Sequence, residues 1–311
     1  MTDNIDTNNP SDGLSYGTFP ITILSDGSVV VYDLAELILP VLRKLLQDDS
    51  ILRKQLCVVH KPKLVTAKKV LTMQIETIKR LMISCEICER RCGVNRLNGE
   101  RGFCELGETL RVGAYANLYN EGCGMGSPAF SVFAAGCSMR CDYCYRNEFL
   151  QTEQFEVMQP ETLAVLLDKA AENGSTCWHF LGGNPDQSIL PILTALSLTK
   201  QTLPVVWNTA FTMTPQTIQV LREVVDIWVP DIKFGNNNCA KKIAKFDNYW
   251  NIVKRNIKLI QNEKQVYVRI PKLPKHETCC QKLIKEFLKS CSLQFVENEV
   301  VTIGKASQHK R

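Results

Sequence analysis

Three cysteines stand close together in the stretch Gly136-Cys137-Ser138-Met139-Arg140-Cys141-Asp142-Tyr143-Cys144. Their spacing is C-x3-C-x2-C, and three thiolates in so short a loop can hold three irons of a [4Fe–4S] cube. Because the loop carries no fourth cysteine, the fourth iron would stay open to a small molecule. The alternative is a structural zinc ion with a fourth cysteine from elsewhere in the chain. Such zinc sites more often show paired C-x2-C knuckles.

Four more cysteines form a second set upstream, with the spacing C-x2-C-x3-C-x11-C. They are Cys85, Cys88, Cys92 and Cys104, and Cys123 is near enough in sequence to replace one of them. The set predicts a second metal site, which could hold structural zinc or a second [4Fe–4S] cluster that relays electrons. Ligand type alone does not separate the two metals, and four unbound thiols are the remaining alternative.

The composition of the chain favours metal or redox chemistry over a disulfide framework. The chain has 311 residues, of which 14 are cysteines, and its N-terminus is polar and acidic rather than a secretory signal. No uncharged apolar run reaches the roughly 18 residues that span a membrane. We therefore expect a cytoplasmic protein, whose cysteines stay reduced. The formal net charge of +5 is too small to indicate a nucleic-acid partner.

Short apolar runs alternate with helical patterns from about residue 129 onward. The predicted strands are 130–134, 177–181, 204–207, 226–229, 266–270 and, less clearly, 300–303; the predicted helices are 160–172, 189–198, 215–224, 249–261 and 282–290. This alternation predicts a parallel sheet with helices outside it. The active site of such a sheet lies at the carboxyl ends of the strands.

Polar residues and glycines follow each predicted strand at the point where a site is expected. They are Gly182, Gly183 and Asn184 after the second strand, Asn208 and Thr209 after the third, Asp231 and Lys233 after the fourth, and Arg269 in the fifth. Each has a simpler reading as well. The glycines could form an ordinary turn, Asn208 and Thr209 could cap the next element, Asp231 and Lys233 could be a strand-end ion pair, and Arg269 could lie at the surface.

The cysteine loop, with an aromatic residue before its last cysteine, resembles the signature of the radical S-adenosylmethionine (SAM) superfamily. From residue 85 to about 285 the chain is similar to iron–sulfur relatives of pyruvate formate-lyase activating enzyme. The similarity rests on Cys85-x2-Cys88, Cys92-Gly-Val-Asn-Arg, Gly102-Phe-Cys104 and Gly122-Cys-Gly-Met-Gly126, then on Val206-Trp-Asn208, Pro230-Asp231-Ile-Lys233-Phe-Gly235-Asn236, Arg269, Pro274-Lys-His276 and Cys279-Cys280.

The resemblance implies an α/β fold, a partial (β/α)6 barrel of parallel strands with the cluster at its open mouth. SAM would chelate the free iron, and one-electron reduction would cleave its sulfonium to a 5′-deoxyadenosyl radical that abstracts hydrogen from a substrate. Cys137, Cys141 and Cys144 would hold the cluster, and Tyr143 would pack near the adenine. The remaining SAM contacts would come from Gly182, Gly183, Asn184, Asn208, Asp231, Lys233 and Arg269.

The chain departs from the family pattern at two places. The family has an acidic residue that meets the SAM ammonium where this chain has Asn184, whose carbonyl oxygen can still accept a hydrogen bond. In the last segment, from Leu293, a final strand is expected, and the chain has instead a short apolar stretch and a basic tail. The single cysteines, Cys239 among them, are expected to be buried small hydrophobes, and His276 is a lone loop histidine.

These features divide the chain into five parts: a flexible leader (1–15), a small α+β N-terminal region (16–82), a Cys-rich metal-binding segment (83–125), the partial barrel (126–303) and a basic tail (304–311). The leading hypothesis is a radical SAM enzyme that acts on a protein or peptide and receives electrons from a flavodoxin- or ferredoxin-like protein. In a second version of this hypothesis, the enzyme acts on a small molecule or nucleotide. The alternative from another class is a non-catalytic iron–sulfur or zinc protein used in electron transfer or assembly.

Overall fold

The protein is described by a computed structural model that covers residues 62–64, 70–119, 128–293 and 295–299, with the backbone of three short strands before them. The chain divides into two units, at residues 1–60 and 61–311. Several predicted features lie outside the described residues: the leader, the glycine-rich stretch 122–126 with Cys123, the strand 300–303 and the basic tail.

The first unit contains a small three-stranded sheet. Strands β1 (Ile21–Ile23) and β2 (Val29–Tyr32) pair antiparallel, which confirms the hairpin that Asp26-Gly27 indicates between two apolar runs. Strand β3 (Leu56–Val59) pairs parallel with β2.

The second unit is built on a seven-stranded sheet in the order β10-β9-β8-β7-β5-β4-β6. Its parallel part consists of β5 (Ala129–Ala134), β7 (Cys177–Gly182), β8 (Val205–Thr209), β9 (Ile227–Pro230) and β10 (Gln265–Val266). Strands β4 (Leu110–Leu118) and β6 (Val157–Met158) extend one side of the sheet in antiparallel pairing. Short 3-10 turns such as η4 (Pro185–Ser188) lie in the connections.

The parallel series continues beyond β10. Strand β11 (Val268–Lys272) is joined to the end of β9 by a parallel bridge between Asp231 and Arg269, and β12 (Phe295–Glu299) pairs parallel with β11. Six successive parallel positions result, so the predicted partial (β/α)6 barrel is confirmed. The expectation that the last segment supplies no final strand is wrong, because β12 begins two residues after Leu293.

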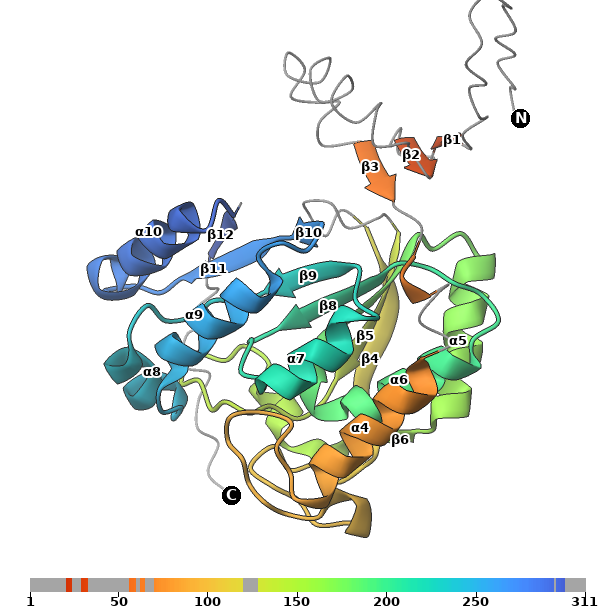
Figure 1. The fold of residues 1–311 in the computed structure, drawn as a ribbon, viewed down its shortest axis with the longest axis horizontal. Coiled ribbons are helices and arrows are strands. Elements are labelled where there is room, and N and C mark those ends of the chain that lie inside the picture. The colour runs from red at the N-terminus through yellow and green to blue at the C-terminus, as the bar shows by residue number, and fades with distance from the viewer. Residues whose placement is uncertain are drawn as a thin grey trace, which may run out of the picture. The chain divides into compact units, whose positions relative to one another are not determined.

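Helices connect the parallel strands and cover the outer side of the sheet, as Figure 1 shows for α6, α7 and α9. Three helices have the predicted bounds: α5 (Pro160–Glu172), α6 (Ile189–Leu198) and α10 (Lys282–Ser290). Helices α7 (Pro215–Arg222) and α9 (Tyr249–Ile260) end one or two residues early, and α4 (Leu71–Ile83) packs on α6 and α7. Helix α8 (Asn237–Ala244) was not predicted, because its polar sequence has the composition of a turn.

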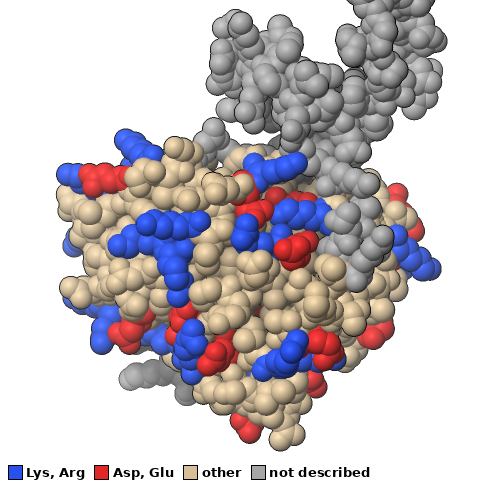
Figure 2. Space-filling model, viewed as in Figure 1, with Lys and Arg blue, Asp and Glu red and all other residues tan. Residues whose placement is uncertain are grey.

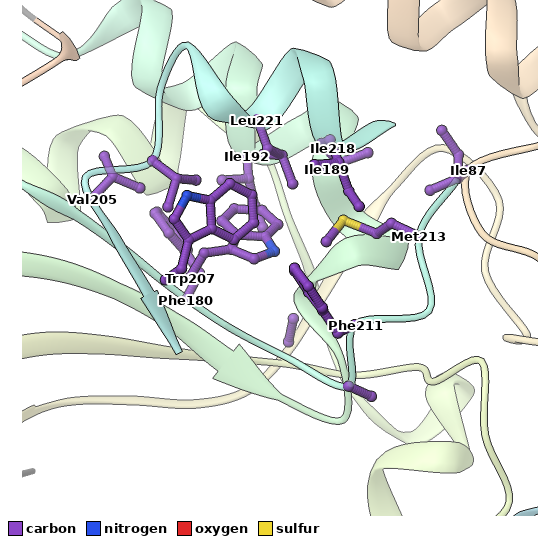
Figure 3. Packing of buried hydrophobic residues seen from close by; sticks show 14 of the residues in the cluster. Ile87, Phe180, Ile189, Ile192, Val205, Trp207, Phe211, Met213, Ile218 and Leu221 are labelled. Atoms are coloured by element: carbon purple, nitrogen blue, oxygen red, sulfur yellow. The ribbon is translucent and has the colours of Figure 1, made fainter. Parts of the chain in front are cut away.

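The core lies between the sheet and these helices. Trp207 and Phe180 point from β8 and β7 toward Ile192 of α6 and Leu221 of α7 (Figure 3), and all four side chains are fully buried. Strand side chains alternate between the two faces of a sheet, so Val206 and Asn208 face the barrel interior instead. The wide apolar outer face therefore fixes which strand residues line the inside.

Charges of both signs are interspersed over the face drawn in Figure 2, and lysine and arginine side chains gather over α9. No helix in the described part of the chain is long and apolar enough to cross a membrane.

Candidate functional site

A cavity of about 330 Å³ opens at the carboxyl ends of the parallel strands. All eleven residues that the sequence predicts for the cluster and for SAM line this one cavity: Cys137, Cys141, Tyr143, Cys144, Gly182, Gly183, Asn184, Asn208, Asp231, Lys233 and Arg269. They come from five segments that span more than 130 residues of sequence. The fold thus brings the strand-end residues together at the place that a parallel sheet provides for a ligand.

The cysteine loop follows β5 directly and is fastened to α8. The backbone amides of Arg140 and Asp142 donate to the carbonyls of Ala244 and Ile243, both at 2.9 Å. Burial raises the pKa of Cys137 to about 11 and that of Cys141 to about 12. At neutral pH such thiols keep their protons unless a metal ion binds to the sulfur in place of the proton. One buried and two half-buried thiols that adjoin at the mouth of a cavity therefore fit the ligand set of a metal cluster.

Gly182 and Gly183 let the strand end approach the cysteine loop closely. Gly182 has φ +116°, and a Cβ there would lie 2.4 Å from the carbonyl oxygen of Ala134. A Cβ on Gly183 would lie 2.5 Å from the carbonyl oxygen of Gly136. Any side chain at these two positions would push the β5 and β7 ends apart, so the glycines maintain the shape of the cavity wall.

A charged network joins the ends of β8 and β9 to the start of β11 inside the cavity. Arg269 Nε and Nη2 donate to the two carboxylate oxygens of Asp231 at 2.7 and 3.2 Å, and Nη2 also donates to Asn208 Oδ1 at 2.6 Å. Lys233 Nζ lies 3.4 Å from Asp231 Oδ2. The side chains of Arg269, Lys233 and Asp231 are only about one-fifth exposed, at 21%, 21% and 22%.

The network places two cationic side chains, Arg269 and Lys233, beside the carboxylate of Asp231. Burial alone would raise the pKa of Asp231, but the charges of Arg269 and Lys233 outweigh burial and hold it well below its usual range. Asp231 is therefore ionised at neutral pH and paired with both cations. A ligand carboxylate that entered the cavity would meet these cations through charge-assisted hydrogen bonds.

Asn184 lines the cavity, but both ends of its amide are already bonded to the protein. Its Oδ1 accepts from the backbone amide of Ala210 at 3.2 Å, and its Nδ2 donates to Asp186 Oδ2 at 3.0 Å. Asp186 is fully buried and also accepts from Trp207 Nε1 and Thr209 Oγ1. The acidic residue missing at 184 is thus present two positions later, where it fixes the strand ends. Its burial raises its pKa to about 6.

Tyr143 is an aromatic wall of the cavity between two of the predicted ligands. Its ring meets the ring of Phe234 edge-on, with centroids 6.2 Å apart. Phe234 in turn packs edge-on against Tyr249, whose hydroxyl accepts from the backbone amide of Lys233 at 3.0 Å. This aromatic row holds the segment after β9 in place and provides an apolar surface beside the charged network.

The second cysteine set is also brought together. Cys85, Cys88, Cys92 and Cys104 line a separate small cavity, with Arg90, Arg96 and Ser138 among its other walls. Burial raises the pKa of Cys88 and Cys104, and the other cysteines of the set add to the effect at Cys88. Arg96 is only 1% exposed, and its Nη1 has no hydrogen-bond partner among the described residues. Clustered thiols beside the buried Arg96 and the half-buried Arg90 fit an anionic metal–thiolate centre.

The backbone at residues 137–139 lies between the cavities of the two cysteine sets. Ser138 lines the second cavity, while its neighbours Cys137 and Met139 line the first. Arg90 Nε donates to the Ser138 carbonyl at 2.9 Å, and the Phe103 ring lies 3.7 Å from the Arg90 guanidinium and 4.4 Å from that of Arg140. A centre held in the second set would therefore be a direct neighbour of one held in the first.

Two features of the barrel were not predicted from the sequence. His179 lies inside the barrel, where burial lowers its pKa to about 3, and its Nε2 has no hydrogen-bond partner in the described part of the chain. Its place in β7, three residues before the strand end, was the available signal. The other feature is a cluster of Cys239, His276, Cys279 and Cys280. Three of these residues lie close together in sequence, but Cys239 lies 37 residues before His276, so the sequence did not indicate one site.

Comparison with known proteins agrees with this geometry. The family model of the radical SAM superfamily matches residues 131–285. The uncharacterized protein MJ0674 of Methanocaldococcus jannaschii is 32% identical over 240 residues, which cover 75% of this chain and 68% of that protein.

Two solved structures are similar at low identity. Streptococcus suis SuiB bound to precursor peptide SuiA has a TM-score of 0.45 and 12% identity over 55% of this chain and 40% of that chain. The enzyme anSMEcpe with bound AdoMet and Kp18Cys peptide has a TM-score of 0.43 and 13% identity over 57% of this chain and 52% of that chain. This chain therefore spans about half or less of either. From the family model and the sequence relative, the chain belongs to the radical SAM superfamily.

Proposed function

We propose that this radical SAM enzyme holds a [4Fe–4S] cluster on Cys137, Cys141 and Cys144, binds SAM in the adjoining cavity, and abstracts hydrogen from a protein or peptide substrate. The observation that carries the proposal is that the three thiols and the Arg269–Asp231–Lys233 network line a single cavity. When bound and reduced, the cluster supplies the electron that cleaves the SAM sulfonium to a 5′-deoxyadenosyl radical.

The residues of the chain supply binding, orientation and exclusion of water. Arg269 and Lys233 line the cavity, and their cationic side chains suit the SAM carboxylate. Tyr143 offers an aromatic surface for the adenine, and Gly182 and Gly183 allow close approach to the backbone. Three thiolates leave one corner of a cube without a protein ligand, so a small molecule can bind there.

The size of the cavity bears on the substrate. Small-molecule pockets occupy about 300–1,000 Å³, so a cavity of about 330 Å³ that also has to hold the cluster leaves little room for a substrate beside SAM. A substrate must then reach the radical from the open end of the cavity. An extended segment of a protein can do so without a pocket of its own, in agreement with the resemblance to activating enzymes.

The second cysteine set is proposed as a metal centre beside the first. Its adjacency through Ser138 and Phe103 supports a role in passing electrons inward from a flavodoxin- or ferredoxin-like reductant, if its metal is iron. With zinc, the same four thiolates would instead fasten the 85–104 segment to the barrel. Counting both metals in the purified protein separates these two roles.

The proposal is tested by iron content and electron paramagnetic resonance after anaerobic reconstitution. SAM should change the spectrum of the reduced cluster in the wild type and in Cys291→Ala, a half-buried cysteine outside every cluster. Cys141→Ala should lose about one cube of four irons and show no SAM-dependent change. If Cys141→Ala keeps both its iron and the response to SAM, the cluster does not lie on this loop.

A further inference from the structure

Four metal-binding side chains meet near the barrel mouth at a place that the radical SAM site does not use. Cys239 comes from the first turn of α8, while His276, Cys279 and Cys280 come from the turn that leads into α10. Within the described residues, this is the one group of three or more Cys, His, Asp or Glu whose donor atoms all lie within 4.8 Å of one another.

The distances among the donors match a tetrahedron around a single ion. The Sγ atoms of Cys239 and Cys279 lie 3.8 Å apart, and those of Cys279 and Cys280 lie 3.9 Å apart. His276 Nδ1 lies 3.5 Å from Cys239 Sγ and 3.1 Å from Cys279 Sγ. Tetrahedral zinc, with Zn–S about 2.3 Å and Zn–N about 2.0–2.1 Å, requires S···S of about 3.8 Å and S···N of about 3.6 Å.

We propose that Cys239, His276, Cys279 and Cys280 bind one structural zinc ion. Three thiolates and one imidazole form a closed tetrahedral donor set of the kind that structural zinc sites use. The set has no carboxylate, which disfavours magnesium, calcium and manganese. The proposal stands independently of SAM chemistry, because none of the four residues lines the SAM cavity.

Spacing also separates this group from the two cysteine sets described above. A cube places one iron under each thiolate, so its ligands stand farther apart than ligands that share one ion. Among the described residues, neither Cys137, Cys141 and Cys144 nor any three of Cys85, Cys88, Cys92 and Cys104 have sulfurs that all lie within 4.8 Å of one another. The three clusters therefore differ in geometry, and only the Cys239 group has the dimensions of a single-ion site.

The surroundings of the group are organised for thiolate ligands. Asn236 caps α8 by accepting from the Cys239 amide at 2.8 Å, and its Nδ2 lies 3.2 Å from Cys239 Sγ and 3.6 Å from Cys280 Sγ. The same Nδ2 donates to the Cys279 carbonyl at 2.6 Å. One amide side chain thus orients three of the four ligand residues. Such outer partners are typical of metal sites.

The backbone turn that presents the ligands is irregular. Residues Glu277–Gln281 form a single π-helical turn before α10, which places His276 and Cys279 on one side together with the next residue, Cys280. The Cys280 carbonyl also approaches Gly235, where a Cβ would lie only 2.3 Å away. Isolated π-turns occur frequently at functional sites. A metal bond to both neighbouring cysteines would account for this tight arrangement.

A zinc ion here would fasten the β11–α10 turn to α8. The other end of α8 holds the cysteine loop, because the Ala244 and Ile243 carbonyls accept from Arg140 and Asp142. The site would therefore stabilise the support of the cluster loop without contacting SAM.

The test is a count of zinc by plasma mass spectrometry in the full chain, purified under reducing, anaerobic conditions from zinc-supplemented medium. Cys239→Ser and Cys279→Ser should each hold one zinc per chain fewer than the wild type and keep the iron of the Cys137 loop. The matched control, Cys291→Ser, changes a cysteine in the same region and should keep the zinc. His276→Ala should lose the zinc and His276→Cys should recover it, because a fourth thiolate also completes a zinc site.

Cobalt provides a second readout for variants that fold poorly. Cobalt loaded into the zinc-free wild type should give the visible absorption of tetrahedral thiolate coordination, and this absorption should be absent from Cys239→Ser. The proposal is overturned if Cys239→Ser and Cys279→Ser hold as much zinc as the wild type. It is also overturned if they lose iron in place of zinc, or if anaerobic wild-type protein has a disulfide within the group.

Discussion

Arg269→Met removes the side chain that joins the start of β11 to the ends of β8 and β9 in the cavity proposed for SAM. Arg269 makes two hydrogen bonds to Asp231 and one to Asn208, and the Asp231 carboxylate would be left with Lys233 at 3.4 Å. Breaking a buried pair costs about 3–5 kcal/mol. Because these side chains are about one-fifth exposed, we take the lower end, about 3 kcal/mol, which lowers the melting temperature by about 6–12 °C.

The same change should weaken SAM binding. A hydrogen bond to a charged group contributes about 1.5–3 kcal/mol, so loss of the guanidinium contact to the SAM carboxylate predicts roughly 10- to 150-fold weaker binding. The assay is anaerobic isothermal titration of SAM into reconstituted protein whose iron content matches that of the wild type. Arg269→Lys keeps the charge but not the forked geometry, so its affinity for SAM should lie between those of the wild type and Arg269→Met.

Arg255→Met is the matched control. Arg255 is paired with Glu89 at 2.8 Å, is 39% exposed and does not line the cavity. This variant should bind SAM as the wild type does and lose about 1 kcal/mol or less of stability. If the Kd of Arg269→Met for SAM lies within twofold of the values for the wild type and Arg255→Met, Arg269 makes no contact with SAM. If its melting temperature is also unchanged, the network does not stabilise the barrel mouth.

Three further predictions concern the surroundings of the site. Asn184→Asp restores the acidic residue of the family pattern but places a second carboxylate 3.0 Å from buried Asp186; it should cost about 1–3 kcal/mol by thermal melting, and Asp186→Asn should recover the loss. The pKa of Asp186 is raised to about 6 in the folded protein, so the unfolded chain loses this proton at a lower pH than the folded chain does. The free energy of unfolding therefore has its full contribution from Asp186 below about pH 4. It falls by about 3 kcal/mol as the pH rises through 6. Asp186→Asn should remove that decline, and an equally steep pH–melting curve in Asp186→Asn would refute the assignment. Cys88→Ala should lose iron or zinc but retain the cluster of the Cys137 loop, and metal counts equal to those of the wild type would show that the second set binds no metal.

The sequence predicted the repeated βα units well because their apolar runs and helical periods are local signals. Helix α5 begins at Pro160, a residue favoured in the first turn of a helix, and its predicted bounds agree with the structure. Strand β4 was missed because all of its residues except Leu110 are half-buried or exposed and its sequence, with Gly113 in the strand, lacks alternation. Helix α8 was missed because asparagines and lysines dominate it, and a single capping residue, Asn236, fixes its start.

The site residues at the strand ends were predictable because a parallel sheet brings the ends of its strands together. The environment of each side chain was not predictable, because it depends on which residue lies opposite. Asn184 is the example: its position in the cavity follows from the strand, but its bonds to Ala210 and Asp186 follow only from the packed structure. The Cys239 group was missed for the same reason, since His276 and Cys239 meet across 37 residues of chain.

The most direct test of the account is formation of 5′-deoxyadenosine by the anaerobically reconstituted protein with SAM and a strong reductant. The account predicts product from the wild type and from Cys291→Ala, and none above background from Cys141→Ala. Absence of product from wild-type protein that holds its full cluster and binds SAM would contradict the proposed reaction. The chain would then be better described as a non-catalytic iron–sulfur protein that functions in binding or electron transfer.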